Sequence, residues 1–144
     1  MTTIEVLKNL TQTTYDSVEG YRVAAEKADS PALKQAFSRR SGERAEILNK
    51  MNNALQANGE QPITAVSTQG KAHQFFLTIT DALSDSNEAA VKRVEEGEDY
   101  LVEQFSEALK RDDLERETRL LIETAFRDIR DGERFADMLE KQYA

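Results

Sequence analysis

Apolar residues recur at intervals of three and four along almost the whole chain, which is the spacing of amphipathic helices rather than strands. Four long segments carry this pattern, and they are predicted to form helices over residues 3–28, 31–58, 87–110 and 114–142. A shorter helix is predicted over residues 68–83, in the connection between the second and third long helices. No segment shows the alternation of a half-buried strand. The predicted fold class is therefore all-α.

The boundaries of these helices are marked by residues with known capping behaviour. Ser30 is suited to cap the second long helix because its side chain can accept a backbone N–H, and Pro31 fits the first helical position. Gly59 is placed to end the same helix. Residues 59–70 then form a loop. Caps for the last two long helices are expected at Asp85 or Ser86 and at Asp112 or Asp113.

The lengths of the connections predict how the long helices are arranged. At a rise of 1.5 Å per residue, each long helix measures about 36 to 43 Å. Short turns join the first to the second and the third to the fourth, so each pair is antiparallel. The middle connection of about 27 residues can cross the full length of a bundle. These features predict a ferritin-like antiparallel four-helix bundle with an additional short helix, although an up-down bundle with a helix across one end remains an alternative. The 144 residues are expected to form one domain, residues 1–144.

The apolar face of the third long helix contains one carboxylate. Val94 and Leu101 lie on this face, and Glu98 takes the position between them. In the second long helix, Arg40 and Arg44 interrupt the centre of the apolar arc in the same way. Charges at such positions are costly to bury unless they are paired.

Two more residues are expected at the same level of the bundle. Asp128 flanks the apolar arc of the last helix, and Tyr21 is an inward-facing group of the first helix, whose acids Asp16, Glu19 and Glu26 fall on the outer half. Antiparallel packing would bring the central charges into one layer. A guanidinium offers a planar fork of donors that matches a carboxylate. The preferred interpretation is that Arg44 faces Glu98 in a buried polar layer made of Tyr21, Arg40, Arg44, Glu98 and Asp128.

A metal site is the alternative interpretation of these acids. Glu43, Glu98, Asp128 and Glu133 could supply carboxylates to iron, manganese or zinc. A carboxylate-bridged metal pair in a bundle core uses Glu-x-x-His motifs on two helices, however, and the one histidine, His73, lies in the short helix. An arginine beside a metal would also repel the cation. The ion-pair layer is therefore favoured, and no cofactor is expected.

Four glycines fall inside the predicted long helices, where each costs roughly 0.5 to 1 kcal/mol relative to alanine. They are Gly20, Gly42, Gly97 and Gly132, and each follows or precedes an acidic residue. Their positions suggest a close approach of backbones, or a local distortion, around the polar layer. Simple tolerance of glycine in long stable helices is the alternative.

Composition and charge exclude several classes of function. The chain carries 19 basic and 27 acidic residues, for a net charge of −8, and the excess lies in residues 84–144. Nucleic acids and anionic membranes bind basic surfaces, so neither is an expected partner. The absence of cysteine excludes disulfides, thiolate metal ligands and a cysteine nucleophile. The first residues lack the basic flank and long apolar run of a signal peptide, and no segment reaches membrane-spanning length, so the expected location is the cytoplasm.

Several stretches of the chain resemble a known family. They are "VLKNLTQTTYDSVEGYRVAAEKA", "ALKQAFSRRSGERAEIL", "VEEGEDYLVEQFSEAL" and "GEQPITAVSTQGKAH". In these stretches the chain resembles the bacterial ferritin-like four-helix-bundle proteins that are classed as a domain of unknown function. The resemblance implies a ferritin-like bundle, a cytoplasmic bacterial protein and expression associated with stress. It implies no established reaction.

The comparison with ferritins and rubrerythrins is informative where it fails. Their first helix carries a metal-binding Glu seven residues before a Tyr, and with Tyr21 as that Tyr the matching residue is Thr14. Their Glu-x-x-His motifs are missing, which leaves Glu43 and Glu98 as retained acids. The expected function is therefore that of a non-enzymatic bundle protein that acts through its acidic surface or by self-association. The alternatives are an altered metal-binding protein, or a protein that binds an apolar ligand or partner helix beside Leu77.

Overall fold

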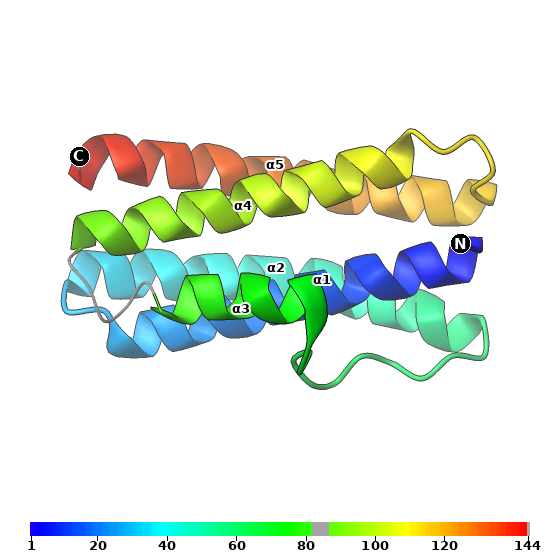
Figure 1. Cartoon of the computed structure of the whole chain (residues 1–144), viewed down its shortest axis with the longest axis horizontal. Helices are drawn as coiled ribbons and strands as arrows, with labels where there is room; N and C mark the ends of the chain where they lie inside the picture. The colour runs from blue at the N-terminus through cyan, green and yellow to red at the C-terminus, as the bar shows by residue number, and fades with distance from the viewer. Residues whose placement is uncertain (82–86, 144) are drawn as a thin grey trace.

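The structure is a computed structural model that describes residues 1–81 and 87–143, and all regular secondary structure in these two ranges is helical. The predicted all-α helical bundle is confirmed. Figure 1 shows the long helices side by side, with a shorter helix along their flank. The helices are α1 (Thr3–Lys27), α2 (Pro31–Ala57), α3 (Gly70–Asp81), α4 (Asn87–Leu109) and α5 (Arg116–Tyr143).

Capping residues mark the starts of the first two helices and the exit from the second, and those predicted at Ser30, Pro31 and Gly59 are confirmed. The Thr2 hydroxyl oxygen accepts the backbone N–H of Glu5 at 3.2 Å. Ser30 accepts the N–H of Leu33 at 3.4 Å, and Pro31 opens α2. After α2, Gly59 has a φ of 79°, the left-handed conformation that favours glycine. Local chemistry therefore fixes the turn between α1 and α2 and the exit from α2.

Two later boundaries differ from the sequence prediction. α3 begins at Gly70 rather than near residue 68. α5 begins at Arg116, so neither Asp112 nor Asp113 caps it. The Asp113 carboxylate does not cap the helix because it accepts two hydrogen bonds from the Arg111 guanidinium, at 2.8 and 2.9 Å. The expected caps at Asp85 or Ser86, and the end of the short helix at residue 83, lie outside the described residues.

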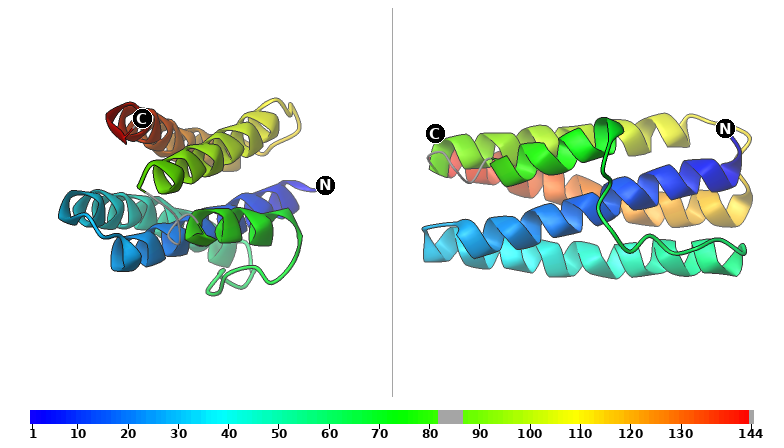
Figure 2. Two further views of the ribbon diagram at one scale, coloured as in Figure 1. Left: turned by 60° about the vertical axis from the view of Figure 1, so that its left-hand side comes forward. Right: turned by 60° about the horizontal axis from the view of Figure 1, so that its bottom comes forward.

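The chain crosses the bundle between α2 and α4. α1 and α2 form one antiparallel pair, and α4 and α5 form a second (Figure 1). After α2, the loop and α3 return along the bundle, so α4 starts at the end opposite to the one where α2 finishes and runs in the same direction as α2. Figure 2 shows the two pairs as stacked layers, with α3 beside α1. α3 packs against α1 and α4. None of the described helices combines the length and the apolar character that a membrane span needs.

The hydrophobic core is divided into two clusters by a polar layer at mid-bundle. One cluster lies toward the start of α1 and the end of α4 and is built around Leu7, Met51, Leu101, Phe105 and Ile122. The other lies toward the end of α1 and the start of α4 and includes Tyr21, Phe37, Val91, Val94 and Ala136. Between the two clusters, α1, α2 and α4 each carry buried polar residues, and Asp128 of α5 reaches the same level. These residues form the candidate site.

Candidate functional site

Each of the four long helices contributes a residue to the polar layer from near its middle. The contributing side chains are Ser17 on α1, Arg44 on α2, Glu98 on α4 and Asp128 on α5. Arg44, Glu98 and Ser17 are fully buried, at 0% exposure each. These three side chains point into the bundle, because each occupies a position on the inward face of its helix where an apolar residue would otherwise continue the pattern.

Arg44 is the centre of the layer. Its Nη1 and Nη2 donate to Oε1 and Oε2 of Glu98 at 2.5 and 2.7 Å, which is a bidentate pair. Nη1 also donates to the Ser17 hydroxyl at 2.6 Å, and Nε lies 3.3 Å from Oδ2 of Asp128. The pair expected between Arg44 and Glu98 is therefore present, and every nitrogen of the guanidinium has an acceptor.

The surroundings hold this arginine in its charged form. Burial alone would lower the pKa of the Arg44 guanidinium, but the negative charge of Glu98 and its hydrogen bonds, with a contribution from Asp128, raise that pKa above its ordinary value. Arg44 also lies over the ring of Tyr21, at 5.6 Å from the ring centroid. Burial and the nearby charge of Glu98 raise the pKa of the Tyr21 phenol well above its ordinary value. Tyr21 therefore stays protonated and neutral next to the ion pair.

Gly132 on α5 makes room for this ion pair. A Cβ atom at this position would overlap Nη2 of Arg44 and Oε2 of Glu98. The close approach expected around the helical glycines is therefore real at Gly132. It is absent at Gly42, where a Cβ would meet nothing within 4 Å because the position faces outward.

Arg40 and Asp128 extend the layer toward its edge. The Arg40 guanidinium donates to the Asp128 carboxylate, so that Asp128 bridges the two arginines. The Arg40 side chain is 6% exposed and that of Asp128 is 15% exposed. Among the described residues, Arg40 Nε and the Tyr21 hydroxyl are buried polar atoms without a hydrogen-bond partner. Every guanidinium nitrogen of Arg44 therefore has a hydrogen-bond acceptor, whereas one buried polar atom of each of its neighbours Arg40 and Tyr21 has no partner.

The four carboxylates of the metal alternative are not brought together. Glu98 and Asp128 both bind Arg44, while Glu43 is exposed and pairs with Arg39 at 3.1 Å. Glu133 lies near Asp99 instead, where burial first and that neighbouring carboxyl second raise its pKa. Among the side chains that the structure describes, no three of His, Asp or Glu are grouped so that they could hold a metal ion. Glu43, Glu98, Asp128 and Glu133, the residues of the alternative interpretation, are therefore not grouped as one ligand set in the described part of the chain.

A second buried carboxylate was not predicted. Asp16 was expected on the outer half of the first helix, but it is fully buried beneath the loop that precedes α3. Its Oδ1 accepts the Ser67 backbone N–H and the Gln12 amide, each at 3.0 Å, and its Oδ2 accepts the Ser67 hydroxyl at 2.6 Å. Burial raises the pKa of Asp16, and the hydrogen bonds from Ser67 and Gln12 oppose that rise.

Further hydrogen bonds fasten the same loop to the bundle. The Tyr15 hydroxyl donates to the Thr64 carbonyl at 2.8 Å, and the Gln12 amide donates to the Ala65 carbonyl at 3.0 Å. Asn52 on α2 exchanges two hydrogen bonds with the backbone of Ile63. His73 is half-buried, with Nδ1 3.0 Å from the Ser67 carbonyl. These side chains fix the crossover segment against α1 and α2, and the signal in the sequence was the group of polar residues on the outer face of helix one.

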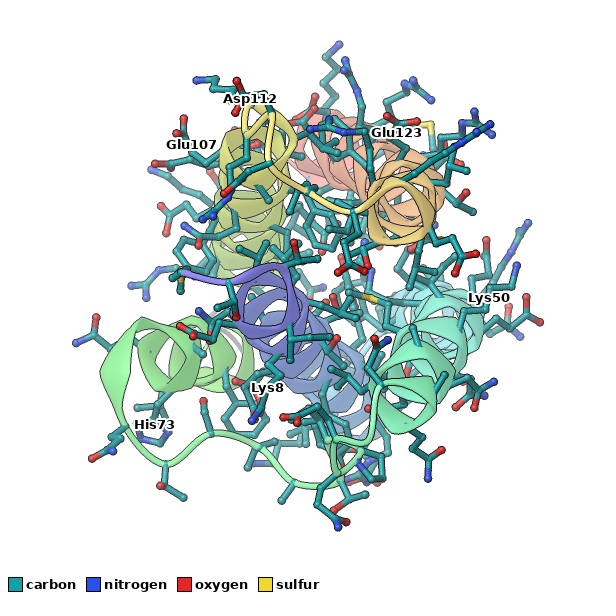
Figure 3. The ribbon with its side chains drawn as sticks, turned by 90° about the vertical axis from the view of Figure 1, so that its right-hand side faces the viewer. Lys8, Lys50, His73, Glu107, Asp112 and Glu123 are labelled. Carbon is teal, nitrogen blue, oxygen red and sulfur yellow. The ribbon has the colours of Figure 1, made fainter. Side chains whose placement is uncertain are left out.

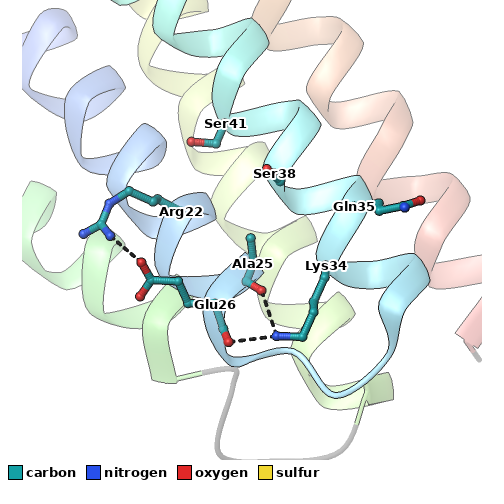
Figure 4. A pocket seen from close by; sticks show the side chains of 7 residues that line it. All are labelled: Arg22, Ala25, Glu26, Lys34, Gln35, Ser38 and Ser41. Carbon is teal, nitrogen blue, oxygen red and sulfur yellow. Dashed lines mark hydrogen bonds and ion pairs between the residues drawn. The ribbon is translucent and has the colours of Figure 1, made fainter.

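A groove between the outer faces of α1 and α2 has the cations Arg22 and Lys34 in its walls (Figure 4). Its cations are already engaged by the protein. Arg22 pairs with Glu19 and Glu26, at 2.8 and 2.7 Å. Lys34 donates to the last carbonyls of α1, those of Ala25 and Glu26. The contacts of Arg22 and Lys34 therefore stabilise the end of α1 and the α1–α2 turn, and we assign no ligand to the groove.

The family of the chain follows from a match over most of its length. The model described as "Domain of unknown function (DUF2383)" matches residues 2–111. The chain belongs to this family. No curated protein and no solved structure matches the chain. The matched range holds α1 to α4, including Arg44 and Glu98, and ends before α5, which supplies Asp128 and Gly132. Family membership therefore adds no chemistry, and the site rests on its geometry.

Proposed function

We propose that this DUF2383 protein is a non-enzymatic, ferritin-like four-helix-bundle protein of bacterial origin, in which a buried arginine–carboxylate layer takes the place of a metal pair. The ferritin-like part of the proposal is supported by the crossover between α2 and α4, which run in the same direction (Figure 1). The sequence resemblance to bacterial bundle proteins supports the origin, the cytoplasmic location and the association with stress.

The observation that carries this proposal is the position of the Arg44 guanidinium. It lies fully buried between Glu98 and Asp128, at the level of the bundle where inward-facing carboxylates would coordinate a metal. Both oxygens of Glu98 and one oxygen of Asp128 are used by this guanidinium. A metal ion at the same level would face a fixed positive charge, and Coulomb repulsion is strong where water is excluded.

A layer of this kind fixes the register of the helices rather than performing a reaction. Replacing a buried ion pair with apolar residues is often neutral for stability, whereas an unpaired member is very costly, so the pair penalises every arrangement that separates Arg44 from Glu98. The function that we infer is therefore exerted by the outside of a rigid bundle, through contacts with itself or with another protein.

Metal content provides the test. Protein purified without chelator, then given iron(II) in air, is analysed by mass spectrometry for bound metal and by absorbance for the rate of iron oxidation. We expect less than stoichiometric metal and a rate equal to that of buffer. Glu98→Gln is the matched variant, since it removes a carboxylate charge and keeps the shape of the side chain. Stoichiometric iron, manganese or zinc that is lost in Glu98→Gln would overturn the proposal and support the altered metal site.

A further inference from the structure

The outer face of α5 is not covered by any other described helix. α3 packs against α1 and α4, on the side of the bundle away from α5. Figure 3, viewed along the bundle, shows α3 at lower left and α5 at upper right. Two of the large apolar side chains that are exposed in the described residues, Leu120 and Met138, both lie on this face, with 52% and 57% exposure. They are five helical turns apart and therefore point in the same direction.

Exposed residues between and beyond these two side chains form a continuous line along the helix. Successive members are separated by three and then four residues, which is the spacing of the contact seam in a coiled coil. All of them are exposed, and they are Glu117, Leu120, Thr124, Arg127, Asp131, Arg134, Met138 and Lys141. We call this line the α5 seam. It faces outward, opposite to the face of α5 that packs on α4 and α2.

The α5 seam is complementary to itself when it is reversed. With a two-fold axis level with Ile129, Leu120 meets the partner's Met138, Arg127 meets the partner's Asp131, and Glu117 meets the partner's Lys141. Each of these contacts occurs twice, because a two-fold interface is isologous. A parallel arrangement would instead place Arg127 against the partner's Arg127 and Asp131 against the partner's Asp131. The charge pattern of the α5 seam therefore favours a second copy of this chain as the partner, and it favours antiparallel packing of the two α5 helices.

We propose that the α5 seam is the contact surface for a second copy of this chain, packed antiparallel about a two-fold axis level with Ile129. The seam runs over the whole length of α5, about 36 Å from Glu117 to Lys141 at 1.5 Å per residue. Leu–Met contacts lie on both sides of the axis and opposite charges lie at the centre and at the ends. This inference rests on the part of the proposed function that assigns contacts to the outside of the bundle, and it does not depend on what fills the bundle centre.

One charge of the seam already has an intramolecular contact. Asp131 pairs with Arg134 at 2.8 Å, and both side chains are largely exposed. A carboxylate has two oxygens and about four acceptor sites, so Asp131 can keep Arg134 and still accept from the partner's Arg127. Exposed ion pairs of this type contribute little, which leaves Arg134 free to turn toward the partner's Thr124.

Sedimentation equilibrium of the full chain, over a range of protein concentrations, tests the proposal. The wild type is expected to dimerise. Arg127→Glu and Asp131→Arg each place like charges opposite one another at two positions, so each is expected to raise the dissociation constant about tenfold or more. Mixing these two variants pairs opposite charges again and is expected to restore a dimer that contains one chain of each. Arg39→Glu on α2, another exposed arginine in a helix, is the matched control and should leave association unchanged.

The outcomes separate cleanly, because circular dichroism reports whether each variant remains folded. A wild type that is monomeric at all concentrations would overturn the proposal. A dimer that Arg127→Glu leaves intact, or that the mixture of the two variants does not restore, would also overturn it, since the contact would then lie elsewhere. None of these results bears on metal content, so failure here is distinguishable from failure of the proposed function.

Discussion

Among the described residues, Glu98 and Asp16 are carboxylates that are completely buried, and they are buried in different ways. Glu98 lies at the centre of the bundle and receives both terminal nitrogens of Arg44, so its charge is matched by an opposite charge. Asp16 lies between α1 and the crossover loop and receives only neutral donors, from Ser67 and Gln12. One carboxylate joins the two helix pairs, and the other fastens a loop to the surface of one pair.

This difference indicates what each carboxylate stabilises. Removing the cation beside Glu98 leaves a buried charge with no compensation in the middle of the fold, so its effect is global. Removing the donors around Asp16 is expected to have a local effect, because the loop can move away from α1 and water can then hydrate the carboxylate.

Replacement of Arg44 is expected to cause the largest loss of stability. Arg44→Met keeps an unbranched side chain in the core but leaves Glu98 without its counter-charge, and breaking a buried pair in this way costs about 3–5 kcal/mol. Urea unfolding followed by circular dichroism measures the loss. Arg39→Met, at an exposed position of the same helix, is the control and should change stability by less than about 0.5 kcal/mol. A midpoint for Arg44→Met equal to that of the wild type would contradict the buried pair.

Two glycine substitutions are expected to have opposite signs. Gly132→Ala forces the Arg44–Glu98 pair to move and should destabilise the protein by about 1–3 kcal/mol, the usual cost of overpacking. Gly42→Ala adds a methyl group in open space and should stabilise it by about 0.5–1 kcal/mol, because alanine is the better helix former. Thermal unfolding of the two variants beside the wild type measures both. Equal shifts would mean that Gly132 does not accommodate the pair.

The Asp16 contacts are expected to matter locally. Asp16→Ala removes the acceptor of three hydrogen bonds, each contributing about 1 kcal/mol, and should release the loop while the bundle stays folded. Limited proteolysis should then cut within residues 58–69 faster than in the wild type. Glu19→Ala, an acid three residues further along α1 that pairs with the exposed Arg22, is the control and should leave the cleavage rate unchanged. Unchanged cleavage in Asp16→Ala would show that Asp16 does not hold the loop.

The smallest effect is expected from a carboxyl group on the surface of α4. Hydrogen bonding to Glu140, followed by burial and the nearby Asp137, raises the pKa of Glu95 to about 8. A raised pKa in the fold means that protonated Glu95 contributes stability, which is complete below the ordinary glutamate pKa of 4.5, declines above it and is lost as the pH rises through about 8. The wild-type unfolding midpoint should therefore fall slightly between pH 7 and pH 9. Glu95→Gln keeps a donor without a titrating proton, so a decline that persists in this variant would assign the effect to another group.

The sequence predicted the parts of this structure that depend on helical periodicity. The long helices follow from the spacing of apolar residues, and Glu98 and Arg44 could be paired because each interrupts an apolar face at mid-helix. Asp16 could not be identified as buried in the same way. Its cover is a loop without periodicity, so only the three-dimensional path of residues 58–69 shows that the outer face of α1 is enclosed. Gly132 and Gly42 likewise differ only in what lies opposite them, which one helix alone does not reveal.

The most direct test of the central claim is a double-mutant cycle between Arg44 and Glu98, measured by urea unfolding in buffer with a metal chelator. The cycle compares Arg44→Met, Glu98→Leu and the double variant with the wild type. A buried ion pair predicts that each single variant is strongly destabilised and that the double variant recovers about 2 kcal/mol or more relative to their sum. Losses that simply add would contradict the account, because Arg44 and Glu98 would then stabilise the bundle independently.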